Sequence, residues 1–430
     1  MKLAIVGSGH VGLVSGACFA EKGYEVLCID NDKKKIATLK KGVIPFYEPG
    51  INELVLTNRR KGRLKFSTSI KEGIDNSEII FIAVGTPLGE DGSADLSYIE
   101  NVSYEIAKYL KDYRVIVEKS TVPVKTGERI KTLISKYAPG KEFDVVSNPE
   151  FLQEGKAIQT TLFPDRIVVG VETKRAEGVM RKLYAPFKAP LIITNLVSAE
   201  LIKHASNSFL ALKISYVNAL ARICELSGAD ITQVAYGIGL DKRIGPDFLK
   251  AGIGYGGYCL PKDVAAFAHI SEQLGYNFNL LKEIQKINVT QRDWFVKKVE
   301  KELWVVKGKK IGVWGLSFKA DTDDTRESPA VEICQRLLEL GAHIQVYDPQ
   351  VHKLQLSDAK HQIKFCRTPY EAAKGVHCLL LVTEWNEFKQ ADFKRLKKIM
   401  LHPTIIDGRN MFDSTMLQRL GFTYRSVGRN

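Results

Sequence analysis

The chain has 430 residues, which is enough for two or three domains of ordinary size. A hydrophobic fraction of 45% and a charged fraction of 26% are typical of a globular protein, and no apolar stretch is long enough to span a bilayer. The net charge is +13, but the basic residues are spread along the chain without an aromatic-interleaved basic motif. We therefore expect no nucleic-acid partner and no membrane partner, and the charge is compatible with steering of a polyanionic small substrate.

An apolar run opens the chain, but it stops at Gly7 and no cleavage-type site follows, so a signal peptide is not expected. The seven cysteines are odd in number, widely scattered and never arranged as a CxxC pair. This pattern predicts no disulfide framework and no metal site, and it favours a reducing cytoplasm.

Strands and helices alternate in the first part of the chain. Periodicity predicts a buried strand, a glycine turn and a helix at 2–6, 7–12 and 11–22, and further strands at 24–30, 78–84 and 115–118. Strands that alternate with helices predict a parallel sheet that binds ligands at the carboxyl ends of its strands.

The pattern changes at Ser198, which we predict to be the N-cap of a long helix. This helix is predicted to reach about Leu226 without glycine or proline, and further helices are predicted at 262–274 and 284–302. The apolar positions of the long helix are too extensive for one buried face. We therefore expect it to form a two-fold interface between chains, with burial inside one chain as the alternative.

A second α/β region begins near Lys309. Ser328 followed by Pro329 is typical of an N-cap and first helical position, and this helix is predicted to end at about Leu340 before Gly341. Strands are predicted at 310–314, 343–347, 377–382 and 404–407. The predicted order is therefore an α/β region, a helical middle and a second α/β region.

The first chemical motif is GxGxxG, which runs from Gly7 to Gly12 between a predicted strand and a predicted helix. Gly7 permits the tight turn, Gly9 lets the backbone approach a pyrophosphate, and Gly12 allows close packing of helix on strand. Asp30 ends the next strand, where a carboxylate accepts hydrogen bonds from an adenosine ribose and repels a 2′-phosphate. The motif predicts NAD rather than NADP, although nearby lysines weaken the preference slightly. The alternative is a glycine turn without a cofactor.

The most informative segment runs from Gly252 to Asp263 and has four glycines in six residues, which suits a loop that wraps closely around a ligand. Pro261 suits the first turn of a helix, and this puts Cys259 at or just before a helix N-terminus with Lys262 nearby. Both features stabilise a thiolate and lower a thiol pKa from about 8.5. We therefore expect a reactive cysteine, with a buried, inert cysteine as the alternative.

Two pairs of polar residues have helical spacing. Lys203 and Asn207 are four residues apart on the long predicted helix and share one face, and Glu150 and Glu154 are also four apart. Taken alone, the first pair is typical of a solvated polar stripe and the second of surface acids.

These motifs together resemble the UDP-glucose 6-dehydrogenase family within the UDP-glucose/GDP-mannose dehydrogenases. The resemblance covers nearly the whole chain in the family's order, and the segments around Cys259 and Lys319 are its most specific parts. It implies two Rossmann-like domains with parallel sheets, an NAD-binding domain at 1–197 and a UDP-sugar-binding domain at 303–430, joined by a helical dimerisation domain at 198–302. The matching stretches are Gly7–Gly12, Tyr47–Gly50, Gly85–Pro87, Ser120–Val124, Asn148–Gly155, Glu200–Asn207, Gly245–Asp263, Gly315–Pro329 and Asp407–Asn410.

The resemblance also implies the roles of individual residues. It makes Cys259 the nucleophile, Lys203, Asn207 and Asp263 the polar groups around the reacting C6, Glu150 the candidate base for hydrolysis, and Thr121 a neighbour of the nicotinamide. The implied cofactor contacts are Gly7, Gly9, Val11, Gly12, Asp30, Lys35, Thr86, Thr121, Glu154, Lys262 and Arg326. The implied substrate contacts are Glu150, Phe151, Leu152, Glu154, Lys203, Asn207, Arg243, Phe248, Leu249, Lys250, Ala251, Gly252, Gly256, Phe318, Lys319 and Arg409, with Arg243 reaching the substrate of a neighbouring subunit.

Three residues depart from the family's pattern. The family usually has glycine where Lys125 stands, serine at Tyr258 and phenylalanine at Leu260. Tyr258 is bulky and directly precedes the expected nucleophile.

The implied reaction is a four-electron oxidation of UDP-glucose to UDP-glucuronate, with two NAD per substrate and with a thiohemiacetal and a thioester on the cysteine. One alternative is a sibling enzyme that acts on GDP-mannose or a UDP-N-acetylhexosamine, although Asp407–Asn410 favour UDP-glucose by resemblance. Two others are a one-step hydroxyacid-type dehydrogenase, which needs no cysteine, and an NAD-binding protein without activity. We expect a cytoplasmic homodimer or higher homo-oligomer.

Overall fold

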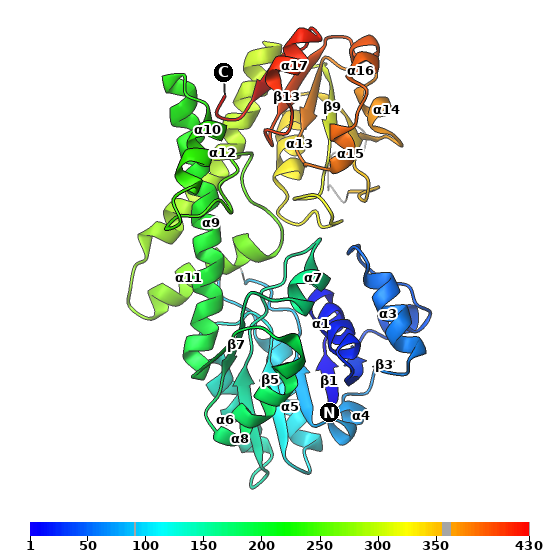
Figure 1. The fold of residues 1–430 in the computed structure, drawn as a ribbon, viewed down its shortest axis with the longest axis vertical. Coiled ribbons are helices and arrows are strands. Elements are labelled where there is room, and N and C mark those ends of the chain that lie inside the picture. Colours follow the sequence, from blue (N-terminus) through cyan, green and yellow to red (C-terminus); the bar gives the residue numbers. More distant parts are fainter. Residues whose placement is uncertain (90–91, 355–362, 430) are drawn as a thin grey trace. The chain divides into compact units, whose positions relative to one another are not determined.

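The computed structural model describes residues 1–89, 92–354 and 363–429, which form an α/β fold with two sheets (Figure 1). The predicted fold class is confirmed. The chain divides into two compact units, one of residues 1–206 and 265–276 and the other of residues 207–264 and 277–430. The division into three domains with boundaries at 197 and 302 stays a prediction.

The first unit contains an eight-stranded sheet in the order β3-β2-β1-β4-β5-β6-β7-β8. Neighbouring strands are parallel except β6 and β7, which pair antiparallel through Ser147 and Gly170. The first six strands therefore have the 3-2-1-4-5-6 order of a dinucleotide-binding sheet. The strands are β1 (Lys2–Val6), β2 (Glu25–Ile29), β3 (Leu64–Ser67), β4 (Ile79–Ile82), β5 (Arg114–Glu118), β6 (Phe143–Ser147), β7 (Ile167–Gly170) and β8 (Leu191–Thr194).

Helices cover both faces of this sheet, as the alternating residues of β1 show. Leu3 and Ile5 belong to a core cluster with residues of α1, α3 and α8, whereas Ala4 and Val6 belong to a second cluster with residues of α4, α5 and α6. A strand that is covered on both faces is apolar along its length, which is why β1 shows no alternation. The helices are α1 (His10–Glu21), α2 (Lys33–Lys40), α3 (Ile51–Arg60), α4 (Ile70–Asn76), α5 (Ser97–Tyr109), α6 (Thr126–Tyr137), α7 (Ala157–Leu162), α8 (Lys174–Tyr184) and the 3-10 helix η1 (Ala185–Phe187).

The helical middle of the chain contains α9 (Leu196–Ser227), α10 (Ile231–Gly239), α11 (Cys259–Gln273) and α12 (Asn279–Leu303). The prediction that Ser198 is the N-cap of α9 is wrong, because the helix already begins at Leu196. The backbone N–H of Ser198 donates to Oδ1 of Asn195 at 2.7 Å, so the Asn195 side chain takes the capping role. The starts of α11 and α12 also lie several residues before the predicted ones.

The second unit contains a six-stranded, wholly parallel sheet in the order β11-β10-β9-β12-β13-β14. Ser328 occupies the predicted N-cap position of α13, but its hydroxyl donates to the carbonyl of Leu316 at 2.7 Å and does not cap the helix. The strands are β9 (Lys310–Trp314), β10 (His343–Tyr347), β11 (Ile363–Phe365), β12 (Cys378–Leu381), β13 (Thr404–Asp407) and β14 (Thr423–Ser426). The helices that follow α12 are α13 (Pro329–Glu339), α14 (Pro369–Ala373), α15 (Asn386–Lys389), α16 (Phe393–Ile399) and α17 (Ser414–Arg419).

The core of the second unit joins this sheet to the long helices. One cluster contains Ile311 of β9, Ile333 of α13, Val217 of α9 and Phe295 of α12, all fully buried. The carboxyl-terminal part of α9 is therefore part of the second unit's core. None of the described helices is long and apolar enough to cross a membrane.

Candidate active site

The glycine motif forms the turn between β1 and α1 in the first unit. Gly7 has a φ of 101°, and a Cβ there would lie 2.3 Å from the carbonyl oxygen of Ala83, so only glycine fits. Gly9 precedes the first residue of α1, has no side chain to cap the helix, and would place a Cβ with nothing within 4 Å. The helix N-terminus therefore presents its N–H groups beside an open space, which is the arrangement that binds a pyrophosphate.

Asp30 lies directly after β2, beside this turn. Its Oδ2 accepts hydrogen bonds from the backbone N–H of Ser8 at 2.9 Å and from Nζ of Lys35 at 2.8 Å, and its Oδ1 accepts from the N–H of Asp32. Two predicted cofactor residues, Asp30 and Lys35, thus form an ion pair. The turn, the helix start and the acid together fit a dinucleotide, since they supply the pyrophosphate and ribose positions of such a site.

Two further predicted residues meet at the carboxyl ends of β4 and β5. The Thr86 hydroxyl donates to the backbone carbonyl of Thr121 at 2.9 Å. Both threonines follow strands of the same parallel sheet, at the edge where ligands of such sheets bind.

Glu150 lies in the loop after β6 and is paired with Lys203 of α9. The distance from Oε1 of Glu150 to Nζ of Lys203 is 3.0 Å, and Oε2 accepts the N–H of Leu152 at 2.7 Å. The Glu150 and Lys203 side chains are only 8% and 5% exposed, so neither a surface acid nor a solvated stripe describes them. The ring of Phe151 lies 5.4 Å from the Lys203 ammonium and 3.9 Å from the Arg166 guanidinium.

Glu48 is a residue of this unit for which the sequence analysis predicted no role. Its carboxylate accepts the backbone N–H groups of Gly155 and Ala157 at 2.8 and 2.7 Å, and it lies 3.2 Å from Nε2 of His10. It therefore fixes the end of the loop that carries Glu150 and Glu154. The signal was available, because Glu48 belongs to the Tyr47–Gly50 stretch that supports the family resemblance, but the contact spans more than a hundred residues.

In the second unit, Cys259 is the first residue of α11, in agreement with the predicted helix N-terminus, and it is half-buried. One turn later, Asp263 accepts a hydrogen bond on Oδ2 from Nδ2 of Asn207 at 2.6 Å, and its Oδ1 lies 2.8 Å from Nζ of Lys262. Asn207 and Asp263 are both buried. Three predicted polar residues are thus held around the first turn of the helix that begins with Cys259.

The glycine-rich loop before Cys259 is anchored by the two long helices. Gly252 donates its N–H to Oδ1 of Asn218 and accepts on its carbonyl from Nε2 of Gln291, both at 2.8 Å. A Cβ at Gly256 would lie 2.3 Å from the carbonyl oxygen of Glu327. The expectation that these glycines serve close contact with a ligand is therefore incomplete, because Gly256 is required by the packing of the protein's own backbone. Of the preceding predicted substrate residues, Leu249 and Ala251 are buried and Lys250 is exposed.

Phe318, Lys319 and Arg409 come together at the carboxyl ends of the second sheet. The Arg409 guanidinium donates to the carbonyl oxygens of Phe318 and Val382 at 2.9 and 2.8 Å. The Lys319 ammonium lies 5.5 Å from the Phe318 ring.

The remaining predicted residues of this unit are more exposed or have unusual backbone geometry. The Arg326 guanidinium lies 4.3 Å from the ring of Tyr258, whereas the Lys262 ammonium is 5.6 Å from the same ring. Arg243 is 89% exposed and pairs with Asp241 of its own chain at 2.6 Å. Phe248 has a φ of 63°, in the left-handed region. The bulky departure at Tyr258 thus contacts two predicted cofactor cations.

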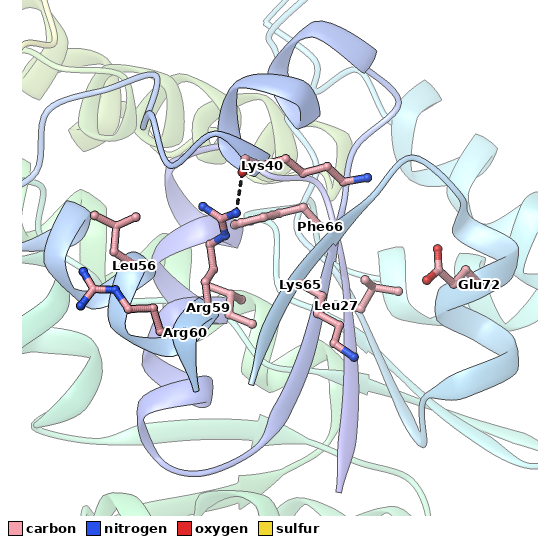
Figure 2. Close-up of a pocket in the computed structure, with 9 residues that line it drawn as sticks. Leu27, Lys40, Leu56, Arg59, Arg60, Lys65, Phe66 and Glu72 are labelled. Atoms are coloured by element: carbon pink, nitrogen blue, oxygen red, sulfur yellow. Dashed lines mark hydrogen bonds between the residues drawn. The ribbon is translucent and has the colours of Figure 1, made fainter. Parts of the chain in front are cut away.

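A separate pocket of about 550 Å³ lies at the β3 edge of the first sheet, and Figure 2 shows its lining. Basic side chains of Lys40, Arg59, Arg60 and Lys65 line it, and the Arg59 guanidinium donates to the carbonyl of Lys40. None of its lining residues is a predicted site residue, and it is open to solvent, so we place the chemistry at the strand ends instead.

Within the parts of the chain that the structure describes, no group of three or more His, Cys, Asp or Glu residues is arranged to hold a metal ion.

Comparison with known protein families identifies the family of the chain. Residues 1–188 match the NAD binding domain of the UDP-glucose/GDP-mannose dehydrogenase family, residues 197–290 its central domain and residues 312–414 its UDP binding domain. The chain belongs to this family. The dehydrogenase is thus an NAD-dependent oxidoreductase, as the sequence predicted.

Individual relatives agree along the full length. The dehydrogenase is 46% identical to UDP-glucose 6-dehydrogenase TuaD of Bacillus subtilis, over all of this chain and 93% of the relative. A UDP-glucose dehydrogenase structure from Pyrobaculum islandicum superposes with a TM-score of 0.93 at 34% identity, covering 100% of this chain and 98% of the other. A UDP-D-ManNAc dehydrogenase structure from Pyrococcus horikoshii gives a TM-score of 0.88 at 27% identity, with 100% and 99% coverage.

Proposed function

We propose that this dehydrogenase oxidises the C6 hydroxymethyl group of UDP-glucose to the carboxylate of UDP-glucuronate. The observation that carries the proposal is Cys259 at the start of α11, with the Asn207–Asp263 pair one turn away, in a chain 46% identical over its full length to a protein named UDP-glucose 6-dehydrogenase. The turn from Gly7 to Gly12 and Asp30 would hold NAD, which would supply the hydride acceptor, and the oxidation of an alcohol to an acid would consume two NAD.

In the first oxidation, the chain must remove the proton of the C6 hydroxyl and stabilise the developing oxygen charge. We assign proton removal to Asp263, acting directly or through water, since its Oδ2 is fixed by Asn207. We assign stabilisation of the oxyanion to the Lys203 ammonium, which is buried and held at 3.0 Å from Glu150.

In the second oxidation, the Cys259 thiolate adds to the aldehyde carbon, and the aldehyde oxygen takes back the proton that Asp263 accepted in the first oxidation, which gives a thiohemiacetal. A second NAD would accept the C6 hydride and Asp263 the hydroxyl proton, which leaves a thioester on Cys259. This covalent capture prevents release of a reactive aldehyde. The position of Cys259 at a helix N-terminus supports the assignment, because such a position favours a thiolate.

We assign the hydrolytic step to Glu150. A water oxygen bonds to the thioester carbon, one water proton passes to Glu150, and the C–S bond breaks to return the Cys259 thiolate. The burial of Glu150 and its fixed orientation through the N–H of Leu152 suit a general base.

The remaining predicted contacts keep their roles as part of the proposal. For the cofactor these are Gly7, Gly9, Val11, Gly12, Asp30, Lys35, Thr86, Thr121, Glu154, Lys262 and Arg326. For the UDP-sugar they are Phe151, Leu152, Glu154, Arg243, Phe248 to Gly252, Gly256, Phe318, Lys319 and Arg409.

We further propose that the enzyme is a homodimer or a higher homo-oligomer. Phe209, Tyr216, Ile223 and Leu226 are 61%, 54%, 59% and 90% exposed on α9, and the first three recur every seven residues. Such spacing puts them on one helix face, as in a helix-to-helix seam. A monomer with full activity in sedimentation at micromolar concentration would contradict this. The thiols of Cys18, Cys28, Cys224, Cys334, Cys366 and Cys378 are not joined in disulfides, which supports a reducing cytoplasm as the location.

A screen of NADH production across sugar nucleotides tests the substrate. We expect kcat/KM for UDP-glucose to exceed that for GDP-mannose, UDP-N-acetylmannosamine and UDP-N-acetylglucosamine by about 100-fold or more, as a site that hydrogen-bonds its own substrate allows. A higher kcat/KM for one of the other three would favour a sibling activity. The comparison of UDP-glucose with UDP-N-acetylmannosamine is the most informative, because the fold is similar to that of a UDP-D-ManNAc dehydrogenase. No NADH with any of them would contradict a catalytic role.

A further inference from the structure

Lys119 is a buried lysine that the proposed reaction does not use. It directly follows the last residue of β5 and is 7% exposed. Its ammonium donates to Oδ1 of Asn148 at 3.2 Å and to the carbonyl oxygen of Asn148 at 3.4 Å. Both acceptors are neutral, so these hydrogen bonds do not compensate the charge, and burying an uncompensated ammonium is costly.

Asn148 links Lys119 to the loop that carries Glu150. The Asn148 amide donates to the carbonyl of Val168 at 2.8 Å, and the Tyr184 hydroxyl donates to its Oδ1. Asn148 is 1% exposed and stands two residues before Glu150. The buried, hydrogen-bonded side-chain amide of Asn148 therefore connects Lys119 to the start of this loop.

Three charged groups act on the Lys119 ammonium. Burial lowers the pKa of Lys119 to about 8, opposed first by Glu150 and then by Glu118, while Lys203 adds to the lowering. Burial also raises the pKa of Glu118 well above its usual range, with Glu200 contributing in the same direction, and Oε1 of Glu118 has no hydrogen-bond partner among the described residues. A raised pKa favours the neutral form of Glu118, and Glu150 makes the larger of the two carboxylate contributions at Lys119.

We propose that Lys119 is a positioning residue for Glu150, holding its loop in place through Asn148 and adding a fixed positive charge to the surroundings of that loop. This inference rests on the proposed function, in which Glu150 activates water. Lys203 already pairs with Glu150, but it also has the task of stabilising an oxyanion on the substrate. A second, fixed ammonium leaves a positive charge near this loop whichever partner Lys203 has, and a nearby positive charge interacts favourably with a carboxylate.

Two substitutions separate the charge from the hydrogen bond. Lys119→Met removes both, whereas Lys119→Gln removes the charge and retains a donor for Asn148. In stopped-flow experiments with UDP-glucose and excess NAD, we expect both variants to form two NADH per active site in the first turnover. Steady-state turnover should fall about 10- to 100-fold, the size of a general-base contribution at its lower end. The pH at half-maximal hydrolysis should rise, since the loss of a positive charge makes the base easier to protonate.

Wild-type turnover and an unshifted pH profile in Lys119→Gln would overturn the charge role and leave a structural one. Loss of the first-turnover NADH in both variants would also overturn the proposal, since it places Lys119 in the oxidations. Lys131→Met is the matched control: it removes a half-exposed ammonium of the same unit, paired with Glu172 at 2.7 Å, and should change neither rate nor profile. Thermal unfolding of each variant reports whether it is folded.

A Glu150→Gln background makes the test specific. If Lys119 acts through Glu150, adding Lys119→Met to Glu150→Gln should lower turnover no further, whereas a multiplicative loss would overturn the proposal. The experiments distinguish failure of the proposed function from failure of the role assigned to Lys119. Absence of NADH from the wild-type enzyme refutes the proposed function, whereas two NADH per UDP-glucose with unimpaired turnover in Glu150→Gln refutes the role of Glu150 and with it that of Lys119.

Discussion

The two sheets have the same local arrangement after their strands β1 and β9. Gly7 after β1 and Gly315 after β9 have φ angles of 101° and 95°, and each is followed by an N–H that donates to an aspartate directly after the next strand. In the first sheet the N–H of Ser8 donates to Asp30 at 2.9 Å, and in the second the N–H of Leu316 donates to Asp348 at 2.7 Å. A glycine turn and an aspartate are thus not sufficient to identify a dinucleotide site.

The surroundings of the two aspartates differ. Asp348 is 2% exposed and also accepts from the N–H groups of Ser317, Gln350 and Val351 and from the indole of Trp385. In addition, α1 begins at His10, directly after its turn, whereas α13 begins only at Pro329, after a long loop. The first sheet therefore places an acid with three protein donors beside a helix N-terminus. In the second sheet more protein donors occupy the acid and no helix begins at the turn.

The largest effect is expected at Cys259, which lies on neither sheet. Cys259→Ser should lower steady-state turnover by about 10⁴-fold or more, as removal of other catalytic nucleophiles does, because the second oxidation needs a tetrahedral adduct. Cys259→Ala should retain NAD affinity, since the first sheet is unchanged. Steady-state kinetics and NAD titration check the two statements, and mass spectrometry of Cys259→Ser after incubation with substrate and NAD looks for an adduct on residue 259. Full two-NADH turnover by Cys259→Ala would refute the thioester route.

A matched pair of substitutions tests the contrast between the two aspartates. Asp30→Ala should raise the KM for NAD about 10-fold or more, the value of a hydrogen bond to a charged group. It should also narrow the preference for NAD over NADP, because the Lys35 ammonium loses its partner and can attract a 2′-phosphate.

Asp348→Ala should instead leave the KM for NAD unchanged and lower the free energy of unfolding by about 2–4 kcal/mol, since several buried donors lose their acceptor. Cofactor kinetics and chemical denaturation of both variants measure the difference. Equal kcat/KM for NAD and NADP in the wild-type enzyme, or a loss of NAD affinity in Asp348→Ala, would break the comparison.

Substitution of a glycine in each turn should show the same contrast, with an effect on stability in the second sheet and an effect on cofactor binding in the first. A Cβ at Gly315 would lie 2.2 Å from Cβ of Thr383, so Gly315→Ala should lower the free energy of unfolding by about 2 kcal/mol or more. A Cβ at Gly9 meets no protein atom within 4 Å, so Gly9→Ala should leave the thermal midpoint almost unchanged and raise the KM for NAD by obstructing the pyrophosphate. A destabilised Gly9→Ala with normal cofactor kinetics would reverse this assignment.

The smallest expected effect concerns Lys125, where the family usually has glycine. Lys125 precedes α6 with a φ of 72°, a left-handed conformation that costs a non-glycine residue about 1–2 kcal/mol. Glycine relieves this strain but loses more conformational entropy on folding, so Lys125→Gly should raise the free energy of unfolding by no more than about 1 kcal/mol. Urea denaturation measures it, and a clear destabilisation would show that the Lys125 side chain has a favourable contact.

Much of the fold was predictable because its signals are local. The apolar run of β1, the glycine turn and Asp30 lie within thirty residues, and Pro261 was enough to place Cys259 at the start of a helix. The antiparallel pairing of β7 was not predicted, since nothing in its short apolar run specifies a direction.

The support of the candidate site was less accessible to sequence reasoning. Glu48, Lys119 and Asp348 act on backbone or side chains far from them in the chain, and their identity as buried residues follows only from the folded core. At the start of α9 the sequence offers two residues of a type that caps helices well, Asn195 and Ser198. Residue type alone does not decide between them, and in the structure Asn195 caps the helix.

The ratio of NADH formed to UDP-glucose consumed tests the central claim most directly. With limiting UDP-glucose and excess NAD, the proposed four-electron oxidation predicts two NADH per UDP-glucose and UDP-glucuronate as the product. A ratio of one, with an aldehyde as the product, would contradict the account and return Cys259 to a structural role.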